Sequence, residues 1–116
     1  MMKEFRDTKY LVDENGDIFR LGKKRKLHIN KYGYNEISLS IRGKQKTFLV
    51  HRMVAECYLP NPNNLPQVDH KDFNKSNNSV RNLEWVTGEE NVKRSLNFGR
   101  QKIWRNQYSK KIEKWQ

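Results

Sequence analysis

The chain has 116 residues, of which 34% are hydrophobic, enough for one compact domain with a small core. Its 24 Lys and Arg against 13 Asp and Glu give a net charge of +11, which favours a polyanion such as nucleic acid as the partner. The sequence contains no apolar run of the ~20 residues that a membrane span needs and no apolar block resembling a signal peptide, and its single cysteine excludes intrachain disulfides and Cys-based zinc sites. We therefore expect a cytoplasmic protein without a membrane partner.

The first part of the chain, residues 1–49, has the pattern of antiparallel β-strands. Two apolar segments, residues 10–12 and 18–21, flank an Asn-Gly pair, which is the strongest short signal for a hairpin. Apolar and polar residues then alternate over 36–41, as in a half-buried strand, and an Arg-Gly-Lys turn leads to a partner strand. This region therefore predicts a set of hairpins.

A helical period follows the strands. One apolar face of a short helix is predicted, formed by Val50, Met53, Val54, Cys57 and Tyr58. Brief strands at 68–70 and 83–86 enclose a polar loop, and Thr87 and Glu90 have the spacing of a capping box. A helix beginning there would carry Asn91 in or just past its first turn.

The predicted fold class is α+β, with three regions along the chain. Residues 1–49 form an antiparallel strand region with a probable role in DNA contact, and residues 50–98 form the core with the strand–loop–strand–helix unit. In residues 99–116, aromatic and apolar residues spaced by four, four and three lie among Lys and Arg. This spacing predicts a basic amphipathic C-terminal helix.

The unit from residue 68 to residue 91 could bring a carboxylate, an imidazole and an amide oxygen together. Asp69 and His70 are adjacent, so in an extended strand their side chains point in opposite directions, one toward a metal and the other toward substrate. Asn91 would supply a second oxygen ligand, and two protein oxygens suit Mg²⁺, which keeps several waters. Neutral His70 could then take a proton from water during hydrolysis of a phosphodiester.

These residues carry a family resemblance. The ordered segments are VHRMVA at 50–55, PNP at 60–62, VDHKD at 68–72, NNSVRNLEWVT at 77–87 and EN at 90–91. In this order they resemble the HNH nucleases of phage genomes and mobile introns, above all the intron-type homing endonucleases. The resemblance spans residues 10–95 and is densest between 50 and 95.

The resemblance implies a ββα-metal fold over residues 67–98. It implies that Asp69 and Asn91 are the metal ligands, that His70 is the general base, and that Asn82 is the central Asn that braces the loop and so orients His70. Asn91 stands where the name of the motif has its last His. Because an amide oxygen is a hard ligand, we expect one Mg²⁺ or Mn²⁺ ion per site rather than zinc or nickel.

The implied activity is metal-dependent nicking of double-stranded DNA, without a small-molecule cofactor. One chain offers one active site, which favours a monomer that cuts one strand. If the gene is phage-borne, the protein would work in the cytoplasm of a bacterial host.

Two groups of cations are the predicted DNA contacts. The basic run would touch phosphates in a sequence-independent, salt-sensitive way and consists of Lys23, Lys24, Arg25 and Lys26. The predicted strand pair around the Arg-Gly-Lys turn could lie in a major groove as a two-stranded ribbon, with Arg42, Lys44 and Lys46 as its cations.

Other interpretations stay open. His51, at the start of the predicted helix, fits a hydrogen-bonded structural role better than a catalytic one. The whole chain could be a non-catalytic DNA-binding module on the same fold, whose binding would persist in EDTA and without His70. A small basic RNA-binding protein would also account for the charge, but it leaves Asp69, His70 and Asn91 unexplained.

Overall fold

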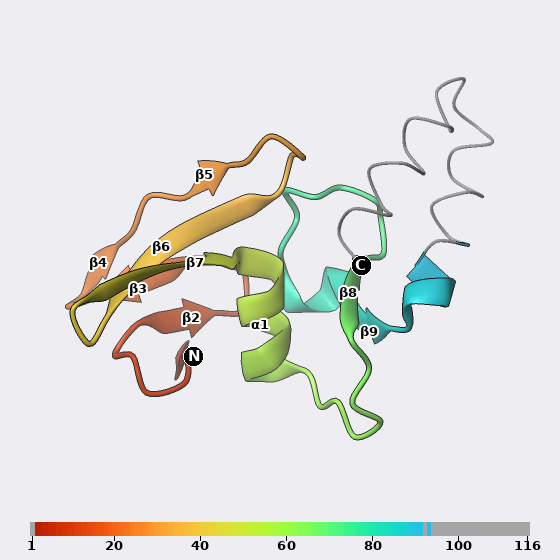
Figure 1. Ribbon diagram of the computed structural model, residues 1–116, viewed down its shortest axis with the longest axis horizontal. Helices are drawn as coiled ribbons and strands as arrows, with labels where there is room; N and C mark the ends of the chain where they lie inside the picture. The colour runs from red at the N-terminus through yellow and green to blue at the C-terminus, as the bar shows by residue number, and fades with distance from the viewer. Residues whose placement is uncertain (1, 92, 94–116) are drawn as a thin grey trace.

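The computed structural model describes residues 2–91 and 93, so the predicted helix over 99–116 lies outside the described residues. The N-terminal part forms a four-stranded antiparallel sheet in the order β1-β2-β3-β4 (Figure 1). Its strands are β1 (Met2–Glu4), β2 (Leu11–Asp13), β3 (Ile18–Arg20) and β4 (Lys23–Lys24).

A second sheet continues the strand region. It has the order β5-β6-β7, with β5 (His28–Ile29), β6 (Asn35–Ile41) and β7 (Lys44–Leu49). The helix α1 (Val50–Tyr58) begins directly after β7. Then come β8 (Gln67–His70), the short 3-10 helix η1 (Val80–Asn82) and β9 (Leu83–Val86), and β8 pairs with β9.

The structure confirms the α+β class, the two hairpins, the helix at its predicted place and both strands around the polar loop. The sequence did not predict β1, whose three residues are all exposed and show no alternation. This strand exists because its backbone pairs with β2, with Lys3 opposite Val12. The basic run likewise contains a short strand, because Lys23 and Lys24 pair with β3.

One hydrophobic cluster joins the strand region to the second half of the chain. Helix α1 lies at its centre, with β2, β6, β7 and β9 packed around it (Figure 1). Val50 and Val54 of the helix are fully buried together with Val12 and Leu39 from the two N-terminal sheets. The Tyr58 hydroxyl also donates a hydrogen bond of 2.7 Å to the Val12 carbonyl. The N-terminal strands therefore help to build the platform on which β8 and β9 lie.

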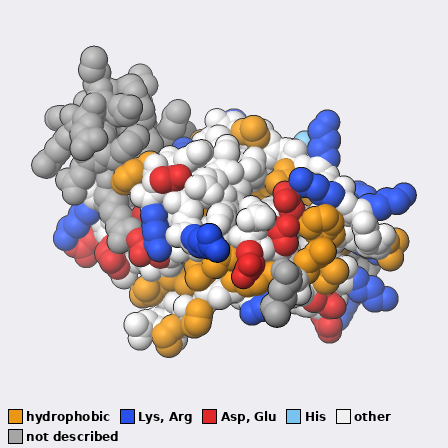
Figure 2. Space-filling model, turned by 180° about the vertical axis from the view of Figure 1, so that it is seen from behind, with side chains coloured by type: hydrophobic (Ala, Val, Ile, Leu, Met, Phe, Trp, Pro, Cys, Tyr) orange, Lys and Arg blue, Asp and Glu red, His pale blue; other side chains and the backbone are white. Residues whose placement is uncertain are grey.

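Charge is unevenly distributed on the surface. In Figure 2, Lys and Arg side chains gather toward the end of the molecule that carries β4 and the β6–β7 turn, which lies opposite β8 and β9 in Figure 1. Within the described part of the chain, no helix has the length and apolar character to cross a membrane.

Candidate active site

Asp69 and His70 lie on strand β8, as the sequence predicted. In the antiparallel pairing Asp69 is opposite Glu84 and His70 is opposite Leu83. Both side chains are buried, with 8% and 5% of their surface exposed. Because successive residues of a strand point to opposite faces, Asp69 shares a face with Gln67, and His70 lies on the other.

A hydrogen bond orients the His70 imidazole. Its Nε2 lies 2.8 Å from Oδ1 of the buried Asn78. Because an amide oxygen only accepts hydrogen bonds, this contact corresponds to the neutral tautomer with the proton on Nε2 and the lone pair on Nδ1. Burial lowers the pKa of His70 below its ordinary value, against the raising effects of the Asn78 hydrogen bond and the Asp69 charge. The ring is therefore held neutral with Nδ1 as its basic atom.

Two further rings enclose His70. The His51 ring lies 4.8 Å from it, centroid to centroid, and Tyr34 stacks on His51 at 5.0 Å. Burial, followed by the charges of His70 and Arg52, lowers the pKa of His51 to about 3. His51 is therefore a neutral ring that lines one side of the site. Among the residues that the structure describes, its Nδ1 has no hydrogen-bond partner, and the contacts of His51 there are ring contacts rather than the hydrogen bonds that the sequence suggested.

Asn82 braces the loop between β8 and β9. Its Nδ2 donates to Asp72 Oδ1 at 2.8 Å and to the Asn77 carbonyl at 2.9 Å, while its Oδ1 accepts from the Asp72 backbone N–H at 3.1 Å. These three bonds go to the loop that carries Asn78. The Asn82 side chain is therefore bonded to the same loop whose Asn78 contacts His70.

The predicted capping box is present. The Glu90 N–H donates to Thr87 Oγ1 at 3.0 Å, and the Thr87 N–H donates to Glu90 Oε1 at 3.2 Å. Residues 88–91 and 93 are helical. Asn91 Nδ2 donates to Gln67 Oε1 at 2.7 Å, and Gln67 shares a strand face with Asp69. The cap thus brings Asn91 to the face of β8 that carries Asp69.

The donor atoms on this face fit a hard divalent ion. In the part of the chain that the structure describes, no three His, Cys, Asp or Glu side chains gather in a way that could hold a metal. The available set is the Asp69 carboxylate and the Asn91 amide, both oxygen ligands, and Mg²⁺ takes one or two such ligands with waters and phosphate oxygens. Beside it lies a small cavity of about 60 Å³, lined by Tyr34, Leu49, His51, Arg52, Gln67, Val68 and Asn91.

The predicted DNA-contact residues lie apart from His70. Lys24, Arg25 and Lys26 of the basic run border a surface recess of about 370 Å³ together with His28, Ile37 and Ser38. Lys44 and Lys46 are exposed, and they pair with Ile41 and Leu39 and so share the apolar face of the hairpin. Its other face carries neutral polar side chains, Ser38, Ser40, Gln45 and Thr47, together with the Glu36–Leu49 pair. Arg42 occupies the turn with φ +52°.

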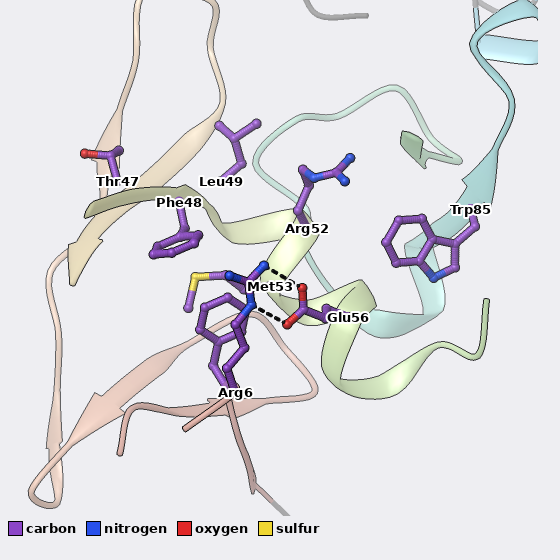
Figure 3. A pocket seen from close by; sticks show the side chains of 9 residues that line it. Arg6, Thr47, Phe48, Leu49, Arg52, Met53, Glu56 and Trp85 are labelled. Carbon is purple, nitrogen blue, oxygen red and sulfur yellow. Dashed lines mark hydrogen bonds and ion pairs between the residues drawn. The ribbon is translucent and has the colours of Figure 1, made fainter. Parts of the chain in front are cut away.

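A second recess, of about 280 Å³, contains none of the predicted site residues. Figure 3 shows Phe48 and Met53 at its floor and the Arg6 guanidinium facing Glu56, which it contacts through two hydrogen bonds of 2.9 and 3.0 Å. Arg52 lies toward Trp85, with its guanidinium 5.7 Å from the ring centroid. The Arg6 and Glu56 charges neutralise each other across this recess, and we do not place the candidate active site there.

Sequence reasoning missed Asn78, the residue that touches His70 most directly. It is one of thirteen asparagines in the chain, and it lies in a polar loop where several others make ordinary turn bonds. Only its burial and its contact with His70 distinguish it. A single sequence shows neither.

The geometry agrees with comparisons to known proteins. The family model described as HNH endonuclease matches residues 48–93, which contain α1, β8, β9 and the start of the capped helix. DNA endonuclease I-HmuI of Bacillus phage SP01 is 38% identical over 117 residues, covering 95% of this chain and 67% of that protein. The chain belongs to the HNH endonuclease family.

Two other similarities agree with this assignment. An HNH endonuclease of Acanthamoeba polyphaga mimivirus is 41% identical over 88 residues, and a solved structure concerning DNA binding and cleavage by the HNH homing endonuclease I-HmuI superposes with a TM-score of 0.77 at 39% identity. They cover 74% and 85% of this chain. The chain spans 27% of the mimivirus protein and 59% of the solved chain. Within the HNH family, the proteins similar to this chain thus include a phage homing endonuclease.

Proposed function

We propose that this protein is a metal-dependent DNA endonuclease that nicks double-stranded DNA. The observation that carries the proposal is the state of His70, a buried neutral imidazole whose Nε2 is engaged by Asn78 and whose Nδ1 is the basic atom. Asp69 precedes His70 on strand β8. Asn91 donates a hydrogen bond to Gln67, whose side chain lies on the same face of β8 as Asp69. A base beside two oxygen ligands is what phosphodiester hydrolysis requires.

In the proposed reaction, Nδ1 of His70 takes a proton from a water molecule, whose oxygen attacks phosphorus. The bond from phosphorus to the leaving oxygen breaks, and that oxygen is protonated from solvent. Asp69 and Asn91 would hold a single Mg²⁺ or Mn²⁺ ion, which supplies charge stabilisation at the phosphate and the leaving oxygen. His51 and Tyr34 keep bulk water from one side of the base, and Asn82 keeps the loop in shape.

The DNA would lie across the basic end of the molecule and reach β8. Its phosphates would contact Lys23, Lys24, Arg25 and Lys26, and the β6–β7 hairpin would contribute Arg42, Lys44 and Lys46. Support comes from the gathering of cations at this end and the net charge of +11 (Figure 2). I-HmuI is described as binding and cleaving DNA, and its structure shares this fold.

The test is cleavage of supercoiled plasmid with Mg²⁺. We expect relaxed product from the wild-type protein, none with EDTA, and a fall of roughly 10²- to 10⁴-fold in His70→Ala. Asn63→Ala, an exposed asparagine of the loop before β8, serves as the matched control and should retain full activity. Circular dichroism checks that each variant folds.

Cleavage by His70→Ala at the wild-type rate would exclude this base. Salt-dependent DNA binding that persists in EDTA without any product would instead favour the non-catalytic module. Tighter binding to RNA than to DNA, with no DNA cleavage, would favour the RNA-binding alternative. Full activity of Asp69→Ala would show that the metal lies elsewhere.

A further inference from the structure

We propose that Asn78 is a positioning residue that sets the tautomer of His70, and that a turn of the N-terminal sheet holds Asn78 in place. The inference deepens the proposed function, since it concerns the same base, but its main readout does not require cleavage. It assigns to the strand region a task besides contact with DNA.

Asn78 is buried beside His70. Only 4% of its surface is exposed, and a buried amide must satisfy its polar atoms inside the protein. Its Oδ1 lies 2.8 Å from His70 Nε2. In water the two neutral tautomers of an imidazole compete, whereas an acceptor held at Nε2 selects the form with the proton there. Nδ1 is then kept basic for the proposed proton transfer.

The loop that carries Asn78 is held from two sides. Asn82 donates to and accepts from residues of the loop 71–79. Two turns of the N-terminal region also make hydrogen bonds to this segment, through the Glu14 and Tyr32 carbonyls. The Val80 N–H donates to the Glu14 carbonyl at 2.9 Å. Lys75 Nζ donates to the Tyr32 carbonyl at 2.9 Å and lies 4.8 Å from the centroid of the Tyr34 ring.

Gly16 lies in close contact with Asn78. A Cβ at Gly16 would lie 2.8 Å from Asn78 Cβ and 3.1 Å from the Asn78 carbonyl oxygen. Neither atom is the far end of a flexible side chain, so a methyl group at residue 16 displaces Asn78 itself. Gly16 also has φ +90°, which only glycine adopts readily. The hairpin turn between β2 and β3 therefore presses directly on the residue that holds His70.

A structural role and a positioning role for Asn78 predict different results. If Asn78 only filled space, a side chain of similar size would restore the site. If Asn78 sets the tautomer, an oxygen acceptor is required. Asn78→Leu keeps the branched shape of the side chain and removes the acceptor, whereas Asn78→Asp keeps an acceptor oxygen at the same position.

The experiment records long-range ¹H–¹⁵N spectra of the imidazoles in the ¹⁵N-labelled full chain, without DNA or metal, at about pH 8, where histidine is neutral. His70→Gln assigns the signals. We expect the Nε2-protonated form for wild type and Asn78→Asp, and a mixture of tautomers for Asn78→Leu. A wild-type ring protonated at Nδ1, or an unchanged tautomer in folded Asn78→Leu, would overturn the proposal.

Gly16→Ala tests the contact from the N-terminal sheet. Gly22→Ala is the matched control, because Gly22 lies in the turn between β3 and β4 of the same sheet and has φ +75° but nothing within 4 Å of its would-be Cβ. Both carry the same kind of backbone strain. We expect Gly16→Ala to give the mixed tautomer and Gly22→Ala the wild-type one. Equal spectra for the two folded variants would contradict the role of the turn.

The nicking assay adds a second readout. The turnover rate of Asn78→Leu should fall by roughly 10- to 100-fold, with a smaller change in KM, as is usual when the partner of a reacting group is removed. If wild type shows the expected tautomer but cleaves nothing, the proposed function fails and this inference stands. If wild type cleaves but Asn78→Leu keeps both tautomer and rate, the inference fails alone.

Discussion

The strand region of residues 2–49 and the strand–loop–strand unit of residues 67–86 are stabilised by different contacts. In the strand region, the large side chains that are buried are apolar, with Phe5, Val12 and Ile18 among them. In the second unit only Val68, Leu83 and Val86 are buried apolar residues, while four buried side chains are polar: Asp69, His70, Asn78 and Asn82.

This difference shows how a small protein can keep polar chemistry in its interior. Buried polar groups cost free energy unless each finds a partner, so the loop between β8 and β9 depends on specific hydrogen bonds. The strand region supplies the apolar cluster around α1 and the turns that clamp the loop. The candidate active site is therefore only partly stabilised by its own segment, and the following changes test that dependence.

The largest expected effect on stability comes from Asn82. Asn82→Ala removes three hydrogen bonds, each worth about 1 kcal/mol net, so the free energy of unfolding should fall by about 3 kcal/mol. Urea unfolding measures it, and nicking should be lost as the loop loosens. The control is Asn63→Ala, which changes an exposed asparagine. A loss of stability no larger than that of the control would show that the loop is held mainly by the N-terminal turns.

The next effect is sensitivity to acid. The pKa of His51 is about 3 in the folded state and ordinarily 6.5, so below about pH 6 the unfolded chain binds a proton that the folded chain does not. The contribution of His51 to the free energy of unfolding is therefore complete above about pH 6.5 and is lost as the pH decreases, by up to about 1.4 kcal/mol per pH unit. The lowered pKa of His70 adds to this loss. His51→Phe should weaken the dependence of stability on pH. Thermal unfolding measures it between about pH 4 and 7, the range in which histidine changes its charge.

Replacement of the exposed His28 by Gln provides the comparison for this measurement. Its curve should run parallel to that of wild type. If His51→Phe gave the same pH dependence as both, the buried ring would not be the origin of the acid sensitivity.

The smallest effect per residue is expected in DNA affinity. Exchanging Lys24 and Lys26 for Gln should weaken binding for every sequence, and the slope of log K against log salt should fall by about 0.9 for each phosphate that no longer meets a cation. Lys44 and Lys46, which share the apolar face of the hairpin, offer a second pair for comparison. Lys9→Gln controls for net charge at an exposed position outside both groups. Because Lys9→Gln removes one charge and each pair removes two, a slope change in Lys9→Gln equal to half of that in each double variant would mean that only total charge matters.

Much of this protein could be predicted from the sequence, because the patterns are local. The alternation of β6, the apolar face of α1 and the capping box of Thr87 and Glu90 depend on residues only a few positions apart, and all three are present. The family resemblance named Asp69, His70, Asn82 and Asn91, and the structure puts the first two on one strand and Asn91 at its face. Their roles stay predictions until the variants are measured.

Tertiary structure decided the rest, since it depends on contacts between distant segments. No local pattern shows that β1 forms, because its only reason is pairing with β2. Nothing in the loop sequence distinguishes Asn78 from its neighbours, and nothing near Gly16 indicates that its missing side chain makes room for Asn78, 62 positions later. The sequence thus determined most of the elements and the chemical groups, whereas folding brings Asn78 Oδ1 to His70 Nε2, a buried contact that only the assembled chain can make.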